Sequence, residues 1–148
     1  MRVFLKRLVL TVWLGMIWSV GYLAAPILFE TLDDRALAGL VAGKLFTAVA
    51  WVSLVAGPIM ALLIMATSER SRRRSLKLIC VVLVMASIAS VHWIFTPMME
   101  VARLPDGTPG ESFLMIHGAS SLVYLLGSLL GLVLLWPGNI DLRIRKES

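Results

Sequence analysis

The chain has 148 residues, of which 59% are hydrophobic and 16% are charged, and its mean hydropathy is +0.88. Soluble domains carry about 25% charged residues, so this composition excludes an ordinary soluble domain and indicates an integral membrane protein. The net charge of +5, from 14 Lys and Arg residues against 9 Asp and Glu residues, is not gathered in one patch, and we expect no nucleic-acid partner.

Four apolar segments follow one another along the chain. About 20 apolar residues suffice for a helix to cross the hydrocarbon core of a bilayer, and the spans are predicted at about residues 8–29, 45–67, 76–99 and 113–136. Their backbone is expected to be helical, because lipid offers no partner to an unpaired peptide group. The predicted fold is therefore all-α, a single domain over residues 1–148 built as a bundle of four transmembrane helices in a lipid bilayer.

The first span follows a short basic segment, an arrangement also found in secretory signals. Its apolar stretch is longer than the roughly 7–15 residues of a signal core, and three more spans follow, so we expect a retained helix. Trp13 and Trp18, and Trp51 in the second span, lie deep in these segments and are predicted to be packing residues. The single cysteine, Cys80, lies in the third span and is likewise interpreted as a packing residue.

Residues 31–44 read as a short helix rather than a plain loop. Thr31 or Asp33 is expected to cap it, Asp34 favours its first turn, and the alanine-rich stretch that follows is a strong helix former. The prediction is a short outer helix that runs on into the second span.

Small residues and prolines are predicted to shape the contacts between spans. Helices in lipid gain little from the hydrophobic effect, so residues that permit close backbone approach matter more. Gly57-Pro58 is expected to kink or loosen the second span, and Pro97 to end or bend the third. Pro105-Asp106-Gly107 predicts a turn between the last two spans. The candidate packing residues are Gly21, Pro26, Gly39, Gly43, Gly127 and Gly131.

The basic residues are sorted by side, which predicts the orientation. Only Arg35, Lys44 and Arg103 lie on one side. By the positive-inside rule, the side rich in basic residues faces the cytoplasm, so both termini are expected there. The eleven residues on that side are Arg2, Lys6, Arg7, Arg70, Arg72, Arg73, Arg74, Lys77, Arg143, Arg145 and Lys146. We interpret the run from Arg70 to Arg74 as a topology determinant that touches anionic lipid.

Ionisable side chains gather near the outer ends of the spans, and such residues at membrane depth raise the question of function. His92 lies roughly 10 Å below the outer end of the third span, and His117 roughly 6 Å below the outer start of the fourth, by helical rise. Lys44 is expected to pair with an acidic neighbour or to bind a substrate. The outer polar cluster comprises Glu30, Asp33, Asp34, Lys44 and Glu100.

Several interpretations of the two histidines remain open. On facing helices they could hold a haem iron axially, or, with the sulfur atoms of Met98 and Met99, a copper ion. They could also form hydrogen bonds between helices, face the lipid headgroups, or belong to a proton or ion pathway. The chain contains no nucleophile elbow, phosphate-binding glycine loop or zinc-protease helix, so no catalytic residue is predicted.

Several segments resemble a known family, the short bacterial relatives of transmembrane protein 205. The segments are Trp13-Leu14-Gly15, Gly21-Tyr22, Ala25-Pro26-Ile27-Leu28-Phe29, Ala38-Gly39, Gly43-Lys44-Leu45-Phe46, Pro97-Met98-Met99 and His117-Gly118-Ala119-Ser120-Ser121-Leu122-Val123-Tyr124. The resemblance implies four helices with both termini inside, in the inner membrane of a bacterium, and no accepted reaction or ligand. More distantly, the first span is similar to copper-resistance D-like membrane proteins and to a haem-containing protoporphyrinogen oxidase. Those proteins have a histidine early in the first helix, whereas this chain has none before His92.

These observations lead to three functional hypotheses. The first is a small inner-membrane protein without enzymatic activity, acting as a homo-oligomer or as an interaction subunit of a membrane protein partner. The second is a haem- or copper-binding redox or metal-handling protein that uses His92 and His117. The third is a small transporter or channel, suggested by the polar outer cluster and the proline in the second span.

Overall fold

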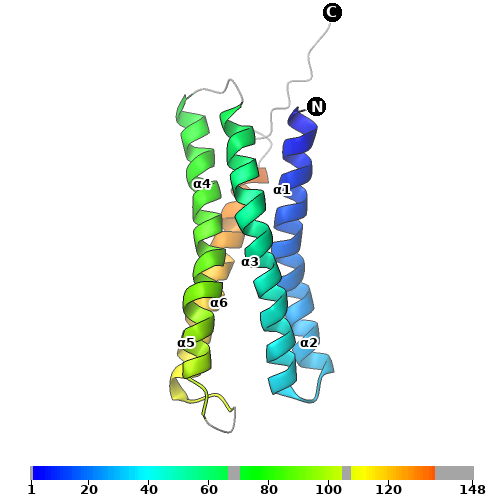
Figure 1. Ribbon diagram of the computed structural model, residues 1–148, viewed down its shortest axis with the longest axis vertical. Helices are drawn as coiled ribbons and strands as arrows, with labels where there is room; N and C mark the ends of the chain where they lie inside the picture. Colours follow the sequence, from blue (N-terminus) through cyan, green and yellow to red (C-terminus); the bar gives the residue numbers. More distant parts are fainter. Residues whose placement is uncertain (1, 67–70, 105–107, 136–148) are drawn as a thin grey trace, which may run out of the picture.

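The computed structural model describes residues 2–66, 71–104 and 108–135, and within them the chain is helical (Figure 1). The single bridge is an isolated pairing of Arg103 with Pro109 in the last connection. The elements in chain order are α1 (Arg2–Trp18), the π-helix η1 (Ser19–Ala24), α2 (Ala25–Thr31), α3 (Arg35–Met65), α4 (Ser71–Ser90), the π-helix η2 (Val91–Phe95), α5 (Thr96–Val101) and α6 (Glu111–Leu135).

Four continuous helical segments are long and apolar enough to cross a membrane, which confirms the predicted all-α bundle. They are Val3–Thr31, Arg35–Met65, Arg72–Val101 and Glu111–Leu135. Most of their described ends reach beyond the predicted hydrocarbon spans, because helix formation does not stop where the side chains become polar. The exception is the end of α3, at Met65, two residues before the predicted limit. The following lie outside the described residues: Thr67, Trp136, the turn Pro105-Asp106-Gly107, and the basic residues Arg70, Arg143, Arg145 and Lys146.

The bundle has two chemically different ends. One end, at the top of Figure 1, holds the start of α1, the end of α3 and the start of α4. We call it the basic end, because Lys6, Arg7 and residues 72–74 lie there. The opposite end holds the α2–α3 and α5–α6 connections. We call it the acidic end, after Glu30, Asp33, Asp34, Glu100 and Glu111.

The short outer helix runs on into the second span, as predicted. It forms the first turns of α3, which continues as one 31-residue α-helix through Pro58. The cap differs from the expected Thr31 or Asp33. Asp34 has an extended backbone, and its carboxylate accepts hydrogen bonds from the N–H groups of Ala36 (2.8 Å) and Leu37 (3.2 Å). These bonds satisfy two of the donors left open at a helix start.

The first and third spans each contain a π-helical turn, which the sequence pattern did not predict. The N–H of Ala25 donates to the carbonyl of Val20, and the N–H of Thr96 donates to the carbonyl of Val91. Each bond joins residues five apart instead of four, which widens the turn.

A proline follows each π-helical turn. Proline lacks an N–H group, and its ring crowds the carbonyl four residues earlier, so a wide turn beforehand relieves that crowding. Pro26 lies in the first turn of α2 and Pro97 in the first turn of α5. Neither proline ends its helix, since the chain stays helical as far as Thr31 and Val101.

The half of the bundle towards the basic end is closed by packing. Trp13 is fully buried, and its Nε1 donates to Ser53 Oγ at 2.9 Å. The prediction that Trp13 is a packing residue is therefore confirmed. The same prediction is wrong for Trp18 and Trp51, which are 37% and 59% exposed. Trp51 instead lies edge-on to the ring of Trp93 on the surface, with centroids 6.0 Å apart.

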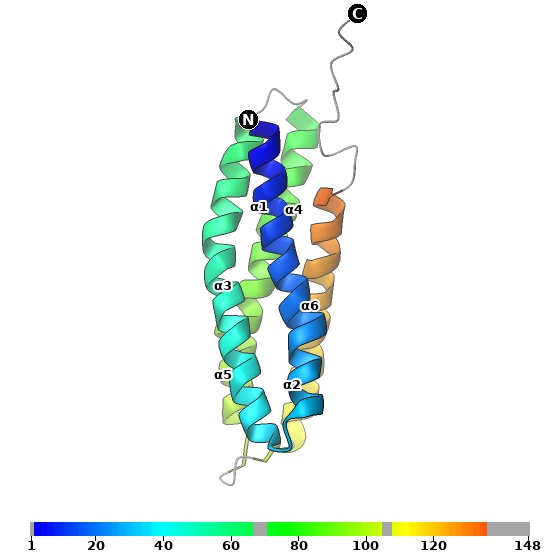
Figure 2. The same ribbon diagram turned by 90° about the vertical axis from the view of Figure 1, so that its right-hand side faces the viewer.

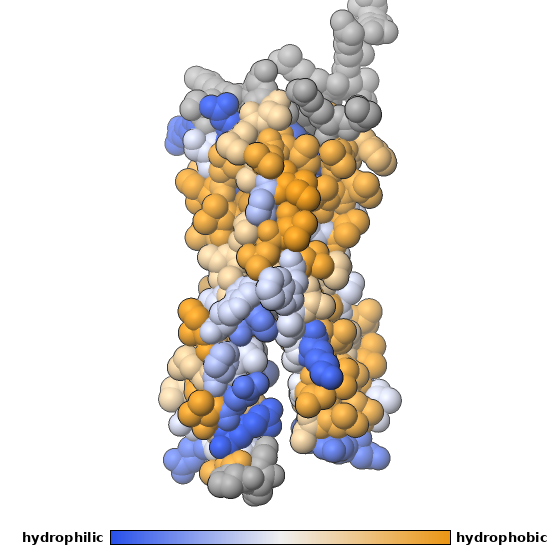
Figure 3. Space-filling model, in the orientation of Figure 1, coloured by the Kyte–Doolittle hydropathy of each residue, from blue (hydrophilic) through white to orange (hydrophobic). Residues whose placement is uncertain are grey.

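Towards the acidic end the bundle divides into two arms. The first arm is α2 with the beginning of α3 (residues 25–47), and α2 packs against α3. The second arm is η2 and α5 with the beginning of α6 (residues 91–104 and 108–117), where both η2 and α5 pack against α6. Figure 3 shows that the molecular surface is hollowed between these arms and that polar side chains border the hollow, whereas the surface of the opposite half is mostly apolar on this face. We call this hollow the notch.

Candidate functional site

Two tyrosines, Tyr22 of η1 and Tyr124 of α6, form the centre of a small network between the first and fourth spans, with ring centroids 6.1 Å apart. Tyr124 of α6 is buried, and its hydroxyl donates to the carbonyl of Ile17, two residues before η1 begins. Its ring occupies the space beside Gly21, where a Cβ atom would overlap it. Phe46 of α3 lies edge-on to the same ring, with centroids 5.2 Å apart. The hydroxyls of Tyr22 and Ser128 lie 2.6 Å apart and share a hydrogen bond.

One column of residues on α3 faces the second arm. Gly39, Gly43, Thr47 and Trp51 are spaced four apart, so they share one face of the helix. Three of them have a neighbour on the second arm. Thr47 Oγ1 lies 3.4 Å from Nδ1 of His92.

Trp51 and Gly39 also have neighbours on the second arm, an aromatic ring and a cation. Trp51 contacts Trp93. A guanidinium nitrogen of Arg103 lies 3.5 Å from the position that a Cβ atom on Gly39 would take. Arg103 thus reaches across the notch to the first arm.

Gly43 is the gap in this column. No atom outside its own helix backbone and its chain neighbours lies within 4 Å of where its Cβ atom would be. Gly39 and Thr47 are eight residues apart, which is about 12 Å along a helix. In the described structure, the notch is therefore open at Gly43, between these two positions, and we call this opening the window. Arg103 borders the window towards the acidic end, and the Thr47–His92 contact borders it towards the middle of the bundle. Between them, the column on α3 presents only backbone.

The predicted outer polar cluster is divided between the arms. Glu30, Asp33, Asp34 and Lys44 belong to the first arm, and all four are exposed. Asp34 is the helix cap described above. Glu100, also exposed, belongs to α5 on the second arm. The pairing of Lys44 with an acidic residue stays a prediction.

The two histidines occupy different settings on the second arm. His92 is half-buried in η2, beside Thr47 and against the ring of Trp93, with centroids 4.7 Å apart. His117 is exposed on α6, and its ring is stacked on Phe113 at 6.0 Å. Phe113 also lies under the guanidinium group of Arg103, 4.9 Å from its ring centroid.

The candidate metal ligands lie on three elements: His92 on η2, Met98 and Met99 on α5, and His117 on α6. Among the described residues, no three His, Cys, Asp or Glu side chains gather closely enough to hold a metal ion. Met98 on α5 is 47% exposed, and Met99 is half-buried. Haem or copper binding by His92, His117, Met98 and Met99 stays a prediction.

The glycines predicted to pack fall into two groups. The missing Cβ atoms of Gly21, Gly127 and Gly131 face Tyr124, Ser87 and Leu14, at positions that a side chain could not share. Gly39 has ordinary contact distances, and Gly43 faces open space.

Reasoning from the sequence missed Thr47, Arg103 and Tyr124. A threonine near the start of a predicted span and an arginine just after the end of one are too common in membrane proteins to indicate a site. The tyrosine carried a usable signal, because a hydroxyl deep in a membrane helix needs a hydrogen-bond partner.

Comparisons with known proteins extend this description. No curated protein and no solved structure matches the chain. One protein family does match, over residues 8–104, which run from the first turns of α1 past the end of α5. The match includes both π-helical turns, the column on α3 and His92, and it stops before α6. The chain therefore belongs to the family described as a domain of unknown function, DUF4149.

Proposed function

We propose that this chain is a small interaction protein of a bacterial inner membrane, without enzymatic activity, that binds a second copy of itself or another membrane protein at the notch. The observation that carries this proposal is the window at Gly43, where the helix backbone is uncovered between two contacts with the second arm. The resemblance to the relatives of transmembrane protein 205, which implies no reaction, supports the same conclusion.

The depth of the window argues for a protein partner. Thr47 and His117 each lie 18 residues from the basic end of their helices, which is about 27 Å of helical rise. They are thus near the far boundary of a hydrocarbon core about 30 Å thick. Polar groups at this depth are stabilised by pairing with other polar groups, and small residues let a second helix approach closely. The notch offers both features.

Cysteine cross-linking in membranes tests the proposal. In a Cys80→Ala background, Gly43→Cys is expected to form a cross-link to its partner, of twice the chain mass for a second copy and of another mass for a distinct subunit. Gly15→Cys is the matched control, because Gly15 also faces open space but lies on α1 in the closed half of the bundle. A monomer without cross-links at Gly43, or equal cross-linking at both positions, contradicts the proposal.

A bulky side chain provides the second test. Gly43→Leu is expected to release the partner during purification in a mild detergent while the bundle stays folded, because the added atoms enter open space. Gly15→Leu is expected to leave the complex unchanged. An unchanged complex in Gly43→Leu contradicts the role of the window.

Haem or copper binding is the second candidate function. The packing of η2 against α6 supports it, because these two elements carry His92 and His117. Protein from cells supplied with iron, haem precursor and copper is then expected to show a Soret band or bound copper that is lost in His92→Ala. Colourless, metal-free protein contradicts this alternative.

A further inference from the structure

The four spans change character at one level of the bundle. In the first and third spans this level holds the π-helical turns η1 and η2. In the second and fourth spans it holds a glycine near a hydroxyl side chain that bonds to its own helix. Each feature lies six to twelve residues from the acidic end of its span, which is roughly 9–18 Å of helical rise. We call residues 19–24, 43–47, 91–95 and 117–121 the transition layer.

Contacts between helices confirm that these segments lie at the same level. Thr47 Oγ1, 3.4 Å from Nδ1 of His92, joins the second span to the third. The ring of Tyr124, three residues beyond the layer in α6, lies against Gly21 of η1 and edge-on to Phe46 of α3. The transition layer therefore crosses all four spans.

In the first and third spans the layer combines two features that bend helices. η1 and η2 have wider turns than an α-helix, and Pro26 and Pro97 follow them. Sharp bends in helices occur mainly at π-helical turns and at prolines. Both spans can therefore change direction here more easily than elsewhere.

In the second and fourth spans, side-chain hydroxyl groups compete with the backbone bonds of the helix. Thr47 Oγ1 donates to the carbonyl of Gly43 at 2.9 Å. Ser120 and Ser121 both donate to the carbonyl of His117, at 2.8 and 2.9 Å. Bonds of this kind often bend a helix, so these two spans are also easily bent at the layer.

Packing holds the four spans together on only one side of the layer. Among the described residues, the continuous hydrophobic core includes no buried residue of the first arm and only Val91 of the second. The buried residues of the first arm, Ala25, Ala38 and Ala42, lie outside this core. Ser53 in the closed half also bonds to its own helix, but it is buried there. The arms are thus the part of the bundle that the core does not fix.

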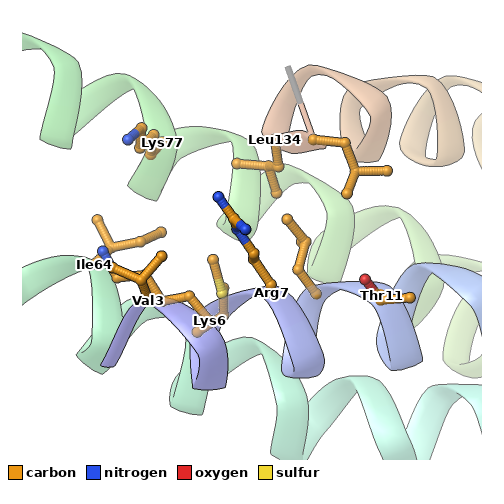
Figure 4. Close-up of a pocket in the computed structure, with 10 residues that line it drawn as sticks. Val3, Lys6, Arg7, Thr11, Ile64, Lys77 and Leu134 are labelled. Atoms are coloured by element: carbon orange, nitrogen blue, oxygen red, sulfur yellow. The ribbon is translucent and has the colours of Figure 1, made fainter. Parts of the chain in front are cut away.

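At the basic end the four spans stay together. Side chains of α1, α3, α4 and α6 line one cavity of about 180 Å³, with Arg7, Ile64, Lys77 and Leu134 around it (Figure 4). Three of these, Ile64, Lys77 and Leu134, are buried. The closed half therefore forms a common base for both arms.

The window indicates the direction in which the arms can move. Gly39 is already at an ordinary contact distance from Arg103 of the second arm, whereas Gly43 faces open space. Glycine lets a second helix approach closely. A rotation of the second arm about the transition layer would bring it onto α3 at Gly43, where no side chain stands in its way.

We propose that the two arms rotate about the transition layer, and that this movement closes and reopens the window at Gly43. The chain then has two conformations, the open one described above and a closed one in which the second arm covers Gly43. The movement belongs to the chain alone, so it does not depend on whether a partner binds at the notch.

Double electron–electron resonance on the full chain, at one chain per lipid nanodisc, tests this proposal. Spin labels are attached to cysteines in a Cys80→Ala background. Glu30→Cys with Glu100→Cys reports the distance between the arms, and Val12→Cys with Val82→Cys reports the distance between α1 and α4 in the closed half. All four labelled positions are exposed.

The pair on the arms is expected to give two distances, and the pair in the closed half a single narrow one. Gly43→Leu is expected to abolish the shorter distance between the arms, because its side chain fills the window. Gly15→Leu is the matched control, since Gly15 also faces open space but lies on α1. It is expected to leave both distances unchanged.

Three results overturn the proposal. A single narrow distance between the arms would show that they do not move. Two distances that persist in Gly43→Leu would exclude closure at the window. Equally broad distributions for both pairs would show that the whole bundle fluctuates, not the arms alone. None of these results bears on binding of a partner, which cross-linking at Gly43 tests separately.

Discussion

At the scale of single residues, the role of each glycine in this protein depends on which atoms lie where its side chain would be. Gly21 and Gly127 permit contacts with Tyr124 and Ser87 that no other residue would allow. Gly15 and Gly43 face open space, so packing does not require glycine there. All four lie in helices, where glycine is unfavourable. Substitution by alanine is therefore expected to destabilise the protein at Gly21 and Gly127 and to stabilise it at Gly15 and Gly43.

Gly21→Ala is expected to destabilise the bundle by about 1–3 kcal/mol, the usual cost of forcing an extra methyl group into a packed site. The added Cβ atom would overlap the Tyr124 ring, whose position is fixed by its hydrogen bond to Ile17. Unfolding by dodecyl sulfate in mixed micelles, followed by circular dichroism, measures the change.

The matched control is Gly15→Ala, which is expected to stabilise the protein by roughly 0.5–1 kcal/mol, since alanine is the better helix former. If both variants changed stability in the same direction and by the same amount, the close contact at Gly21 would not be energetically important.

At the scale of elements, the junction between α1 and η1 depends on a residue far away in sequence. Where the bonding pattern changes from four residues to five, the regular ladder of carbonyl acceptors is interrupted. Tyr124 of α6 donates to the carbonyl of Ile17 immediately before this change. The tyrosine hydroxyl thus supplies a donor at the point where the helix widens.

Tyr124→Phe is expected to destabilise the protein by about 1–2 kcal/mol, because the buried carbonyl loses a donor. The same unfolding assay measures this effect. Tyr22→Phe is the comparison, since Tyr22 is 48% exposed and its partner Ser128 keeps a hydrogen bond to the carbonyl of Leu125. Its expected cost is below about 1 kcal/mol. A larger loss for Tyr22→Phe would contradict the role given to the junction.

At the scale of the whole molecule, the α1–α3 part and the α4–α6 part of the bundle pack together in the half towards the basic end and separate towards the acidic end. Figure 2, turned by 90° from Figure 1, shows the four helices running side by side over most of their length. Buried side chains, among them Trp13, Ile17 and Tyr124, belong to one hydrophobic core in the interior of the bundle. Transport or conduction, the third hypothesis for this chain, would require a second conformation or an oligomeric path.

The charge distribution predicts the orientation of this bundle in the membrane. In intact cells, Asp33→Cys in a Cys80→Ala background is expected to react with a membrane-impermeant maleimide. Arg73→Cys is expected to react only after permeabilisation, because the positive-inside rule places the basic end in the cytoplasm. Both positions are exposed, so accessibility does not explain a difference. The reverse labelling pattern would contradict the proposed orientation and the cytoplasmic termini.

The sequence by itself determined the four apolar helices and the separation of basic from acidic residues. Both properties depend on many residues together. A helix crosses a bilayer only when enough of its side chains are apolar, and the backbone of such a segment must be helical because lipid leaves its polar groups unpaired. The helix ends were less accurate, because helix propensity continues past the hydrocarbon boundary, as it does before Leu8 in α1 and before Leu76 in α4.

Only the tertiary structure decided how single residues are used. The sequence motif Gly39-x-x-x-Gly43 reads as a packing surface, yet Gly43 faces open space because the two arms diverge there. The π-helical turns, the contact between Thr47 and His92, and the closeness of Arg7 and Lys77 to one cavity depend on how distant helices are placed. Hydropathy and spacing report the environment of a helix as a whole, whereas a contact depends on the rotation and separation of two helices.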